Sequence, residues 1–566
     1  MKKLLKILFV ILTAFVALIV LTIIYFNIFF SISNPNIHQT KILSKDLYKV
    51  SDNFYKLGNN WIKKNDAGLW EMYIEGTPYQ RGLAIGYLSK DLIQSQEKAF
   101  IDGINQLIPS KFYLNFLKYF VAWFNRDIES YIKEEYRYEI YGISQSASKD
   151  YDYIGTNYER ILNYHAAHDI GHALQNLHLV GCTSFATWGD ASKDGELIIG
   201  RNFDFYFGDE FSKNKIVSFY NPDKGNKFMI ITWGGMIGAV SGMNEKGLTV
   251  TINAAKSDIP TQAKTPITIV TREILQYAKN IEQALEIAKK HVTFVSESIL
   301  IGSKEDKKAV IIEKTPQKTV MFSNNSNYII CTNHFQSPEF KYDKLNNDSY
   351  YETSSHYRYD RVNELIEKYK PLDPLKAALI LRDQKGFNDK NIGLGNEKSI
   401  NQLIAHHSVV FCPESLMVWV STEPYQLGEF VAYDLNKVFN EYKNLNEDKD
   451  ITEDELNIPS DNFLVSADYK KYLNYRKLKS EFKLASKYNL KMQGNQIDSI
   501  ILSNPDYYET YLMVADYYYN SKDYENASKY YKLALTKETS SMLEYKNIKE
   551  KLDFSIKNLN EKKSKR

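Results

Sequence analysis

The chain opens with a long apolar stretch that follows a short basic segment. Residues 7–30 carry no charge, and this length exceeds the ~20 residues that a helix needs to cross a bilayer. No clear small-x-small cleavage site follows at residues 31–36. We therefore predict an uncleaved transmembrane helix over residues 1–30, with a cleaved signal peptide as the alternative. Because lysines favour the cytoplasmic side, we expect a single-pass, membrane-anchored protein with the remaining chain at the periplasmic or extracellular face of a bacterial cell.

The next part of the chain changes from polar to amphipathic. Residues 31–67 are polar and weakly patterned, and we interpret them as a stalk with some helix. Residues 69–75 alternate like a strand, and helical periodicity follows a turn and continues, with breaks, to residue 178. Residues 68–181 are therefore expected to form a mainly helical region.

From residue 182 the pattern becomes one of short apolar runs separated by glycine turns. Helical periodicity interrupts these runs at residues 267–289, 359–369 and 374–382. Strands, central helices and further strands predict an α+β domain with layered sheets over residues 182–436. The apolar runs lie at residues 197–199, 228–233, 248–252, 310–313 and 416–420.

The last part of the chain is predicted to be all helical. Residues 437–461 are rich in Asn, Glu, Asp and Lys and are interpreted as a linker to residues 462–566. Within the latter, residues 507–538 resemble one tetratricopeptide (TPR) unit, with small residues where two helices would meet. One repeat cannot bury its own apolar face, so flanking helices at 467–490 and 541–558 must complete it. This TPR-like domain could bind a protein partner, or it could serve as a structural cap.

Composition limits the classes of partner and cofactor. With 566 residues, of which 44% are hydrophobic and 25% charged, the chain is expected to hold several globular domains. A net charge of +2 without a basic, aromatic-interleaved stripe argues against nucleic acid as a partner. Three cysteines give neither a disulfide scaffold nor a paired zinc motif. A metal could still bind a helix face that carries His165, His168 and His172, with His178 nearby.

Cys182 is the candidate nucleophile. It follows Gly181 and precedes two small hydroxylated residues, a context that suits a cysteine which becomes a new N-terminus. Its thiol could then attack while its own α-amino group, with a pKa of about 7.7–8.0, acts as the base. Asp204 could orient the resulting ammonium, and Arg201 could favour the thiolate. The alternative from spacing alone is a small buried cysteine at the start of a strand.

Six motifs together carry a resemblance to a known family. Gly-Cys-Thr-Ser-Phe at 181–185 and Gly-Arg-Asn-Phe-Asp-Phe at 200–205 come first, followed by strands that end at Asn253 and Asn333. An Arg-Tyr-Asp-Arg segment at 358–361 and a last hairpin over 407–420 complete the set. The ordered set resembles the N-terminal-nucleophile (Ntn) hydrolases of the acyl-CoA:6-aminopenicillanic acid acyltransferase type and, more distantly, choloylglycine hydrolases and acid ceramidases.

The resemblance implies a fold, a reaction and site roles. It implies an αββα sandwich that works without a metal or another cofactor. Asn253 and Asn333 would stabilise the oxyanion, and Arg358, with Arg361 as the alternative, would brace the site. The expected protein is a self-processing cysteine hydrolase or acyltransferase that acts on a small N-acyl or lipid-like substrate through a thioester on Cys182. The alternatives are a papain-like enzyme whose base is His406 or His407, a phospholipase B-like lipid hydrolase, and a non-catalytic membrane-tethered TPR scaffold.

Overall fold

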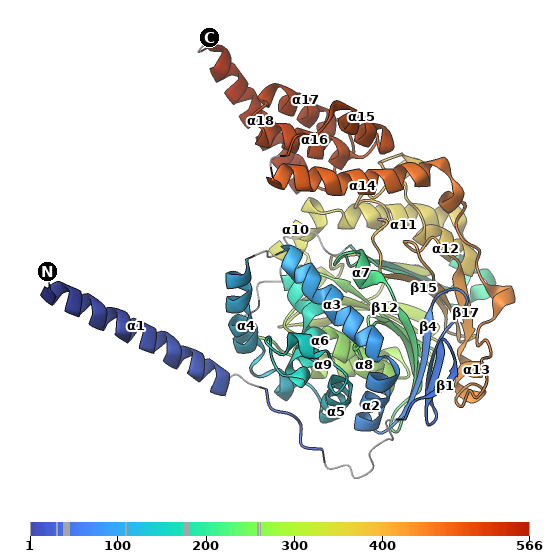
Figure 1. Cartoon of the computed structure of the whole chain (residues 1–566). Helices are drawn as coiled ribbons and strands as arrows, with labels where there is room; N and C mark the ends of the chain where they lie inside the picture. The colour runs from blue at the N-terminus through green and yellow to red at the C-terminus, as the bar shows by residue number, and fades with distance from the viewer. Residues whose placement is uncertain are drawn as a thin grey trace.

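The structure, a computed structural model, describes residues 2–29, 32–37, 46–107, 110–173, 181–256, 260, 262–488 and 490–564. In these residues the strands form one sheet of eleven strands and one of six (Figure 1). The larger sheet has the order β1-β2-β3-β4-β7-β8-β9-β10-β11-β12-β13. Neighbouring strands run antiparallel except β4 and β7, which are parallel. Its strands are β1 (Tyr48–Ser51), β2 (Phe54–Leu57), β3 (Asn60–Lys64), β4 (Trp70–Gly76), β7 (Ile216–Pro222), β8 (Phe228–Thr232), β9 (Ser241–Asn244), β10 (Leu248–Ala254), β11 (Glu297–Ser303), β12 (Lys308–Lys314) and β13 (Thr319–Phe322).

The smaller sheet is antiparallel and has the order β14-β5-β6-β15-β16-β17. Its second strand, β5, begins one residue after Cys182 and lies between β14 and β6. The candidate nucleophile is therefore next to an inner strand of this sheet. The strands are β5 (Thr183–Thr187), β6 (Ile198–Phe203), β14 (Tyr328–Cys331), β15 (His407–Cys412), β16 (Met417–Ser421) and β17 (Phe430–Asp434).

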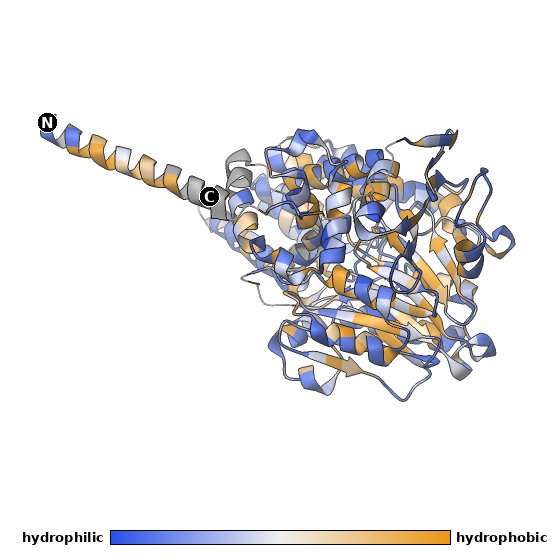
Figure 2. Cartoon of the chain, turned by 90° about the horizontal axis from the view of Figure 1, so that it is seen from below, coloured by the Kyte–Doolittle hydropathy of each residue, from blue (hydrophilic) through white to orange (hydrophobic). Residues whose placement is uncertain are grey.

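Apolar side chains hold the two sheets face to face and join helices to both outer faces. Ile199 and Val409 of the smaller sheet share one buried cluster with Phe219 and Leu300 of the larger one. Figure 2 shows the corresponding apolar strands in the interior. The resulting four layers are helices, sheet, sheet and helices, so the predicted α+β core is supported. The larger sheet packs on α2 (Pro78–Leu88), α3 (Lys90–Leu107), α5 (Glu134–Ser144), α6 (Asn157–Ala173), α8 (Ile267–Tyr277) and α9 (Ile281–Lys290), and the smaller sheet packs on α11 (Ser355–Tyr369) and α12 (Pro374–Leu381).

Strand alternation explains how a polar residue reaches the space between the sheets. In β10, the side chains of Leu248, Val250 and Ile252 belong to the cluster beneath the outer helices. Successive side chains of a strand point to opposite faces, so Asn253 faces the other sheet. Its side chain accepts a hydrogen bond from Ser184 Oγ of β5 at 2.9 Å. The sequence pattern of one strand thus directs this amide toward Cys182.

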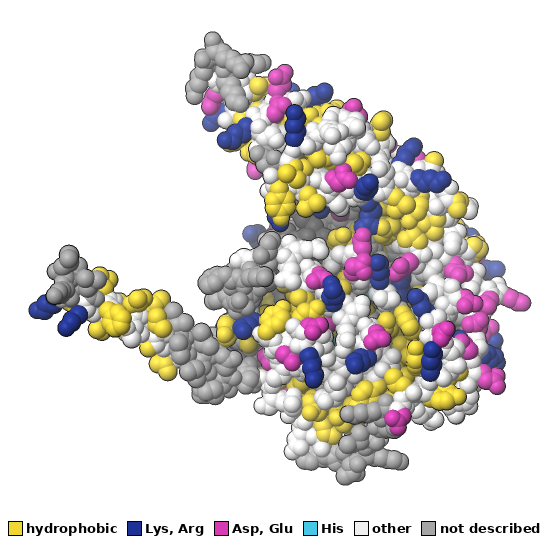
Figure 3. Space-filling model, viewed as in Figure 1, with side chains coloured by type: hydrophobic (Ala, Val, Ile, Leu, Met, Phe, Trp, Pro, Cys, Tyr) yellow, Lys and Arg dark blue, Asp and Glu magenta, His cyan; other side chains and the backbone are white. Residues whose placement is uncertain are grey.

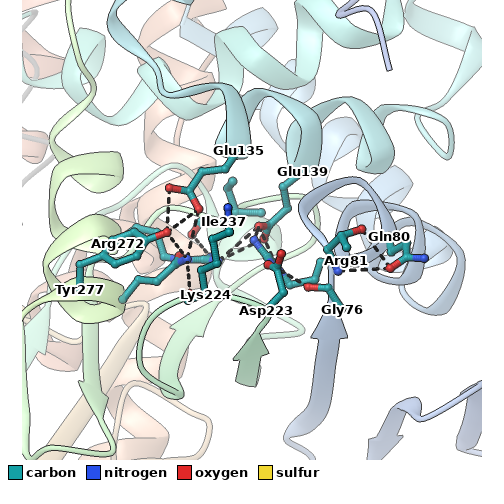
Figure 4. A network of polar contacts seen from close by, with 12 residues as sticks. Gly76, Gln80, Arg81, Glu135, Glu139, Asp223, Lys224, Ile237, Arg272 and Tyr277 are labelled. Carbon is teal, nitrogen blue, oxygen red and sulfur yellow. Dashed lines mark hydrogen bonds and ion pairs between the residues drawn. The ribbon is translucent and has the colours of Figure 1, made fainter. Parts of the chain in front are cut away.

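A buried ionic network joins the mainly helical region 68–181 to the rest of the fold (Figure 4). Glu139 of α5 accepts hydrogen bonds from Arg81 of α2 at 2.9 and 3.1 Å and from Arg272 of α8 at 3.3 Å. All three side chains are fully buried. Arg81 also pairs with Asp223 at 2.9 Å. Because β4 also pairs with β7, the segment before Cys182 is part of the central layers of the fold.

The structure differs from three expectations about the chain's organisation. Much of the expected stalk forms β1, β2 and β3, because Trp61 and neighbouring apolar residues such as Phe54 and Ile62 are buried in the fold. The helix expected over 267–289 is broken, since Asn280 caps a second helix with its side chain. The expected linker 437–461 begins inside α13 (Leu435–Asn440) and packs on the larger sheet, where Trp61 Nε1 of β3 donates to Tyr442 O at 3.0 Å.

The membrane prediction is corrected by the structure. Helix α1 (Lys2–Phe29) projects away from the body in Figure 1. In the described residues, however, no helix is both apolar and long enough to span a bilayer. The predicted transmembrane anchor is therefore wrong. The predicted single-pass membrane attachment is not supported either.

The C-terminal region consists of helices with a hydrophobic cluster of their own. Helices α16 and α17 occupy the segment that resembles a TPR unit, and Asp523 caps α17 with its side chain. Buried Ala515, Ala527 and Ala534 allow the two helices to approach closely. The TPR assignment stays a prediction. The helices are α14 (Ala467–Tyr488), α15 (Gly494–Ser503), α16 (Tyr508–Asn520), α17 (Tyr524–Leu535) and α18 (Met542–Ser564).

Charges of both signs are interspersed over the face of the body shown in Figure 3. The whole chain has a net charge of only +2. Charges that alternate over a surface cancel at a distance, so this face attracts neither anions nor cations by a long-range field.

Candidate active site

Cys182 lies between the two sheets in a fully enclosed position. Its side chain is 1% exposed, and it is a free thiol. The preceding peptide is fixed at both ends, because the Gly181 N–H donates to Asp204 O at 3.0 Å and the Gly181 carbonyl accepts from Gln402 Nε2 at 2.7 Å. Gly181, on the N-terminal side of the Gly181–Cys182 bond, is thus held by two hydrogen bonds.

Arg201 brings a positive charge to the thiol. It lies on β6 opposite Ser184, and its guanidinium donates to Cys182 Sγ at 3.6 Å. Further hydrogen bonds to Ser241 Oγ, at 2.6 Å, and to the carbonyl of Ile252 hold the guanidinium in place. Burial raises the pKa of the Cys182 thiol to about 11, while Arg201 opposes that rise. In the intact chain the thiol is therefore protonated near neutral pH.

Asp204 is a buried carboxyl without a hydrogen-bond partner. In the described part of the chain, neither of its side-chain oxygens has one, although the residue is 0% exposed. Burial raises its pKa to about 7, and the positive charges of Arg358 and Arg201 oppose this shift. Buried carboxylates normally have hydrogen-bond partners, so this one is a vacant acceptor beside Cys182.

Asn253 and Asn333 form the opposite wall of the site. Asn253 Nδ2 donates to Cys331 O at 2.9 Å, and Asn333 Nδ2 donates to Ala254 O at 2.9 Å. Asn253 is fully buried and Asn333 is half-buried. A carboxamide nitrogen carries two hydrogens, so each donor keeps one for a further acceptor.

Arg358 joins Cys182 to Asn333 through hydrogen bonds, whereas Arg361 pairs with carboxylates. The Arg358 guanidinium donates to Cys182 O at 2.6 Å, to Thr183 Oγ1 at 2.8 Å and to Asn333 Oδ1 at 2.7 Å. Burial lowers its pKa to about 10. Arg361 instead faces the carboxylates of Glu364, Asp383 and Asp389. Of the two arginines in the motif, the first is the one that reaches Cys182.

The histidine pair lies near the site without touching the thiol. His406 Nδ1 and His407 Nδ1 are 3.2 Å apart, and His407 Nε2 is 2.9 Å from Ser241 Oγ. In the described residues, the hydrogen-bond partners of Cys182 Sγ are Arg201 and the Asp204 carbonyl. Burial lowers the pKa of His406 to about 3, which makes it a poor base near neutral pH. This geometry does not favour a papain-like pair.

On α6, the predicted metal-site histidine whose side chain is described, His165, has a different role. His165 is buried, and its Nε2 accepts a hydrogen bond from the Ile237 N–H at 3.0 Å. The side chains of His168 and His172 and the whole of His178 lie outside the described residues. In the part that is described, no cluster of three or more metal-ligating side chains forms.

An apolar cavity lies next to the site. Its volume is about 50 Å³, and Phe205, which follows Asp204, is one of its walls. Helices α3 and α6 and the 233–236 loop provide most of the others. The cavity is lined by Ile93, Gln96, Glu97, Phe100, Ile161, Tyr164, His165, Ala167, Phe205, Phe211, Trp233, Gly234, Gly235 and Met236.

Two residues of the site were missed by sequence reasoning. Ser241 joins Arg201 to His407, and Gln402 bonds the Gly181 carbonyl. Gln402 lies in a polar loop whose composition predicts exposure, yet it is only 3% exposed. Neither residue has a sequence signal, because their positions depend on long-range packing.

Comparison with known proteins gives one family match and several distant relatives. Residues 191–422 match the family model for acyl-coenzyme A:6-aminopenicillanic acid acyl-transferase. An uncharacterized protein of Archaeoglobus fulgidus is 24% identical over 372 residues, which cover 59% of this chain and 61% of that protein. Protein dcd1B of Dictyostelium discoideum is 21% identical over 291 residues, covering 48% and 54% respectively. The matched part spans between half and two thirds of each of these curated relatives.

Two solved structures show weaker likeness. The Caenorhabditis elegans ortholog of N-acylethanolamine-hydrolyzing acid amidase is 17% identical with a TM-score of 0.30, covering 41% of this chain and 93% of its own. A variant of conjugated bile acid hydrolase from Clostridium perfringens is 16% identical with a TM-score of 0.32, covering 45% and 93%. At such scores these two likenesses establish nothing further. The family match is a likeness to this acyl-transferase family over residues 191–422, which is less than half of the chain.

Proposed function

We propose that this chain is a self-processing cysteine hydrolase or acyltransferase that acts on an N-acyl amide. Cleavage of the Gly181–Cys182 bond makes Cys182 a new N-terminus. Its thiol then attacks the acyl carbonyl of the substrate, a thioester forms, and water or an amine accepts the acyl group. The match of residues 191–422 to an acyl-transferase family supports this class of reaction.

The observation that carries the proposal is the vacant Asp204 carboxyl. It is buried, it lacks a hydrogen-bond partner in the described residues, and its backbone oxygen already binds the Gly181 N–H. A buried carboxyl without partners costs stability in the uncleaved chain. Cleavage at Gly181 would release an α-ammonium group beside it and supply the missing donor. We therefore assign Asp204 the role of orienting the new amine.

The thiol needs that amine as its base. Burial holds the Cys182 pKa at about 11 in the intact chain, and Arg201 lowers it only in part. A free α-amino group titrates near pH 8, so close to neutral pH it can accept the thiol proton during attack. Arg201 would then stabilise the thiolate through the hydrogen bond that it already donates to Sγ.

Asn253 and Asn333 are proposed as donors to the oxyanion, and Arg358 as the residue that braces them. Arg358 bonds both Asn333 Oδ1 and the Cys182 carbonyl, so it fixes the distance between nucleophile and oxyanion wall. The cavity beside Phe205 has an apolar lining and is small, so it would suit at most a short hydrocarbon group. A lipid ester is the alternative substrate.

The test is the state of the Gly181–Cys182 bond and its link to activity. Denaturing electrophoresis and N-terminal sequencing of the purified protein should give a fragment that begins at Cys182, and Cys182→Ala should stay intact. Cys331→Ala is the matched control, because Cys331 is also buried and free and should leave cleavage unchanged. Matched N-acyl amides and esters then identify the substrate. An active wild type that remains wholly uncleaved would refute the amine-as-base mechanism.

A further inference from the structure

The loop of residues 391–404, between α12 and β15, joins the candidate active site to the C-terminal helices. On one side the Ile400 carbonyl accepts a hydrogen bond from Asn202 of β6 at 3.0 Å. On the other side Leu403 is a buried member of the hydrophobic cluster of the C-terminal helices. Figure 1 shows α14 lying across the end of the body that carries α11 and α12. The loop is thus held from two directions.

Gln402 of this loop bonds the carbonyl group that self-cleavage must attack. Its Nε2 donates to Gly181 O at 2.7 Å, and the side chain is only 3% exposed. A Cβ atom on residue 181 would lie 2.5 Å from this nitrogen, which is too close for any side chain. Gly181 therefore permits the approach of Gln402, in addition to any freedom it gives the backbone.

The backbone that presents Gln402 is strained. Leu403 has a φ of 55°, a left-handed value that costs energy for a residue with a branched side chain. Such a conformation persists only where the surroundings enforce it. Here the Leu403 N–H donates to Asn401 Oδ1 at 2.9 Å, and its side chain is fixed among the C-terminal helices. The strained conformation is therefore held by a hydrogen bond within the loop and by packing in the cluster of the C-terminal helices.

Further contacts clamp the loop to the same helices. Asn504 bonds both backbone groups of Leu394, accepting from its N–H at 3.1 Å and donating to its carbonyl at 2.8 Å. Glu538 binds Lys398 at 2.6 Å. At Gly393 a Cβ would lie 2.3 Å from Tyr507 Cα, so loop and helix backbones are in close contact. The position of the loop depends on the C-terminal helices at several points.

We propose that Gln402 is a catalytic residue for self-processing, and that the C-terminal helices hold the 391–404 loop so that Gln402 stays on the Gly181 carbonyl. This inference rests on the proposed function. In the first step the Cys182 Sγ–C bond to the Gly181 carbonyl carbon forms, and negative charge develops on Gly181 O. The C–N bond to Cys182 then breaks, and the thiol proton passes to the departing nitrogen. Water hydrolyses the thioester, giving a Gly181 carboxylate and a free Cys182 thiol and amine.

Gln402 contributes because its hydrogen bond strengthens as that charge develops. A preorganised donor to an oxyanion is worth about 10²–10³ in rate. Asn504 does not touch the reacting atoms, so it is a positioning residue that acts through the loop. The C-terminal helices would then be required for maturation of the enzyme.

The first test follows cleavage of the freshly synthesised full chain by pulse-chase labelling and electrophoresis. Gln402→Leu and the isosteric Gln402→Glu, which lacks the donor, should both slow cleavage about 10²-fold or more. Gln336→Leu is the matched control, because it also removes a 2.7 Å bond from a glutamine Nε2 to a backbone carbonyl, that of Ile330. It should cleave at the wild-type rate. Thermal unfolding in a Cys182→Ala background checks that each variant folds.

The second test addresses the contacts that hold the 391–404 loop against the C-terminal helices. Asn504→Ala should slow cleavage, whereas Asn520→Ala, which removes a bond to Ser486 within the C-terminal helices, should not. Combined with Gln402→Leu, Asn504→Ala should add little, since both act on one interaction. Wild-type cleavage rates in both Gln402 variants would overturn this inference and leave the proposed function intact. A wild type that never cleaves at Gly181 would overturn both.

Discussion

The Arg358 guanidinium donates a 2.6 Å hydrogen bond to the carbonyl oxygen of Cys182, while Arg361, on the same helix, binds three carboxylates. Arg358→Lys should therefore lower kcat by about 10-fold or more, because an ammonium cannot reproduce the planar fork of a guanidinium. Arg361→Lys is the matched control and should reduce thermal stability with little loss of kcat. Steady-state kinetics and thermal unfolding of both variants separate these outcomes. Equal losses of kcat would contradict the assignment of Arg358.

The carboxyl of Asp204 should control the pH dependence of the reaction. A carboxylate near the Cys182 ammonium favours the charged form and raises the pKa of that amine. The reaction needs the neutral amine, so Asp204→Asn should move the acid limb of the kcat/KM profile to lower pH. It should also reduce the maximum rate, because the amine loses its orienting partner. An unchanged profile, measured on fully cleaved protein, would show that Asp204 does not contact the amine.

The Glu139 network should keep the two fragments together after cleavage. Glu139 comes from the segment before Gly181, and Arg272 comes from the segment after Cys182. Glu139→Leu leaves two buried guanidinium groups without their shared partner, and losing one member of a buried pair costs about 3–5 kcal/mol. We expect a strongly lowered unfolding temperature and fragments that separate during gel filtration.

Asp102→Asn is the control for that experiment. It breaks an exposed pair with Lys98, and solvent-exposed ion pairs contribute little to stability. Its unfolding temperature should stay close to that of the wild type. Fragments of the Glu139 variant that still elute together at wild-type stability would contradict the role of the network.

Local sequence patterns predicted the inner strands better than the strands at one end of the larger sheet. The runs at 228–233 and 248–252 correspond to the inner strands β8 and β10, which are buried along their whole length. Strands β1 to β3 were missed, since short edge strands with polar residues resemble loops. The break at Asn280 was missed because both sides share helical periodicity.

The site residues could be predicted where they lie in a sequence motif. They could not be predicted where only tertiary packing brings them to the site. Cys182, Asp204 and Arg358 lie in recognisable motifs, and the structure brings them together. Gln402 and Ser241 come from segments without a motif, and their contacts depend on how distant elements pack. The apolar stretch before residue 30 led to a different kind of error, in which a local pattern was interpreted too strongly. Hydropathy alone suggested a transmembrane helix that the described structure does not support.

Glu71 should make stability depend on pH. It is fully buried, accepts hydrogen bonds from Asn65 and Tyr433, and lies 3.8 Å from Lys63. Burial raises its pKa from the ordinary 4.5 to about 7. The folded state then holds a proton that the unfolded state loses, so stability falls as pH rises from about 4.5 to about 7. Glu71→Gln should flatten this dependence, whereas Asp52→Asn at an exposed site should not. Unfolding temperatures at pH 5 and pH 8 provide the check.

The two asparagines that we propose as oxyanion donors should fail in different ways when they are removed. Asn333 is half-buried, and its amide bonds Ala254 O and Arg358. Asn333→Ala should lower kcat about 10²–10³-fold with little change in KM, because an oxyanion donor acts mainly once charge has formed. Asn253 also joins Ser184 to Cys331 between strands, so Asn253→Ala should lose stability as well as kcat.

Asn346 supplies the matched control for both variants. Its amide is fully buried in bonds to the backbone of Phe335, away from Cys182. Asn346→Ala should therefore lower the unfolding temperature while leaving kcat of the folded, cleaved enzyme unchanged. The decisive comparison is kcat for the three variants on one N-acyl amide, using only protein that has been cleaved at Gly181. If Asn333→Ala and Asn253→Ala keep wild-type kcat, the oxyanion is stabilised by other donors and both asparagines serve to hold the strands in place.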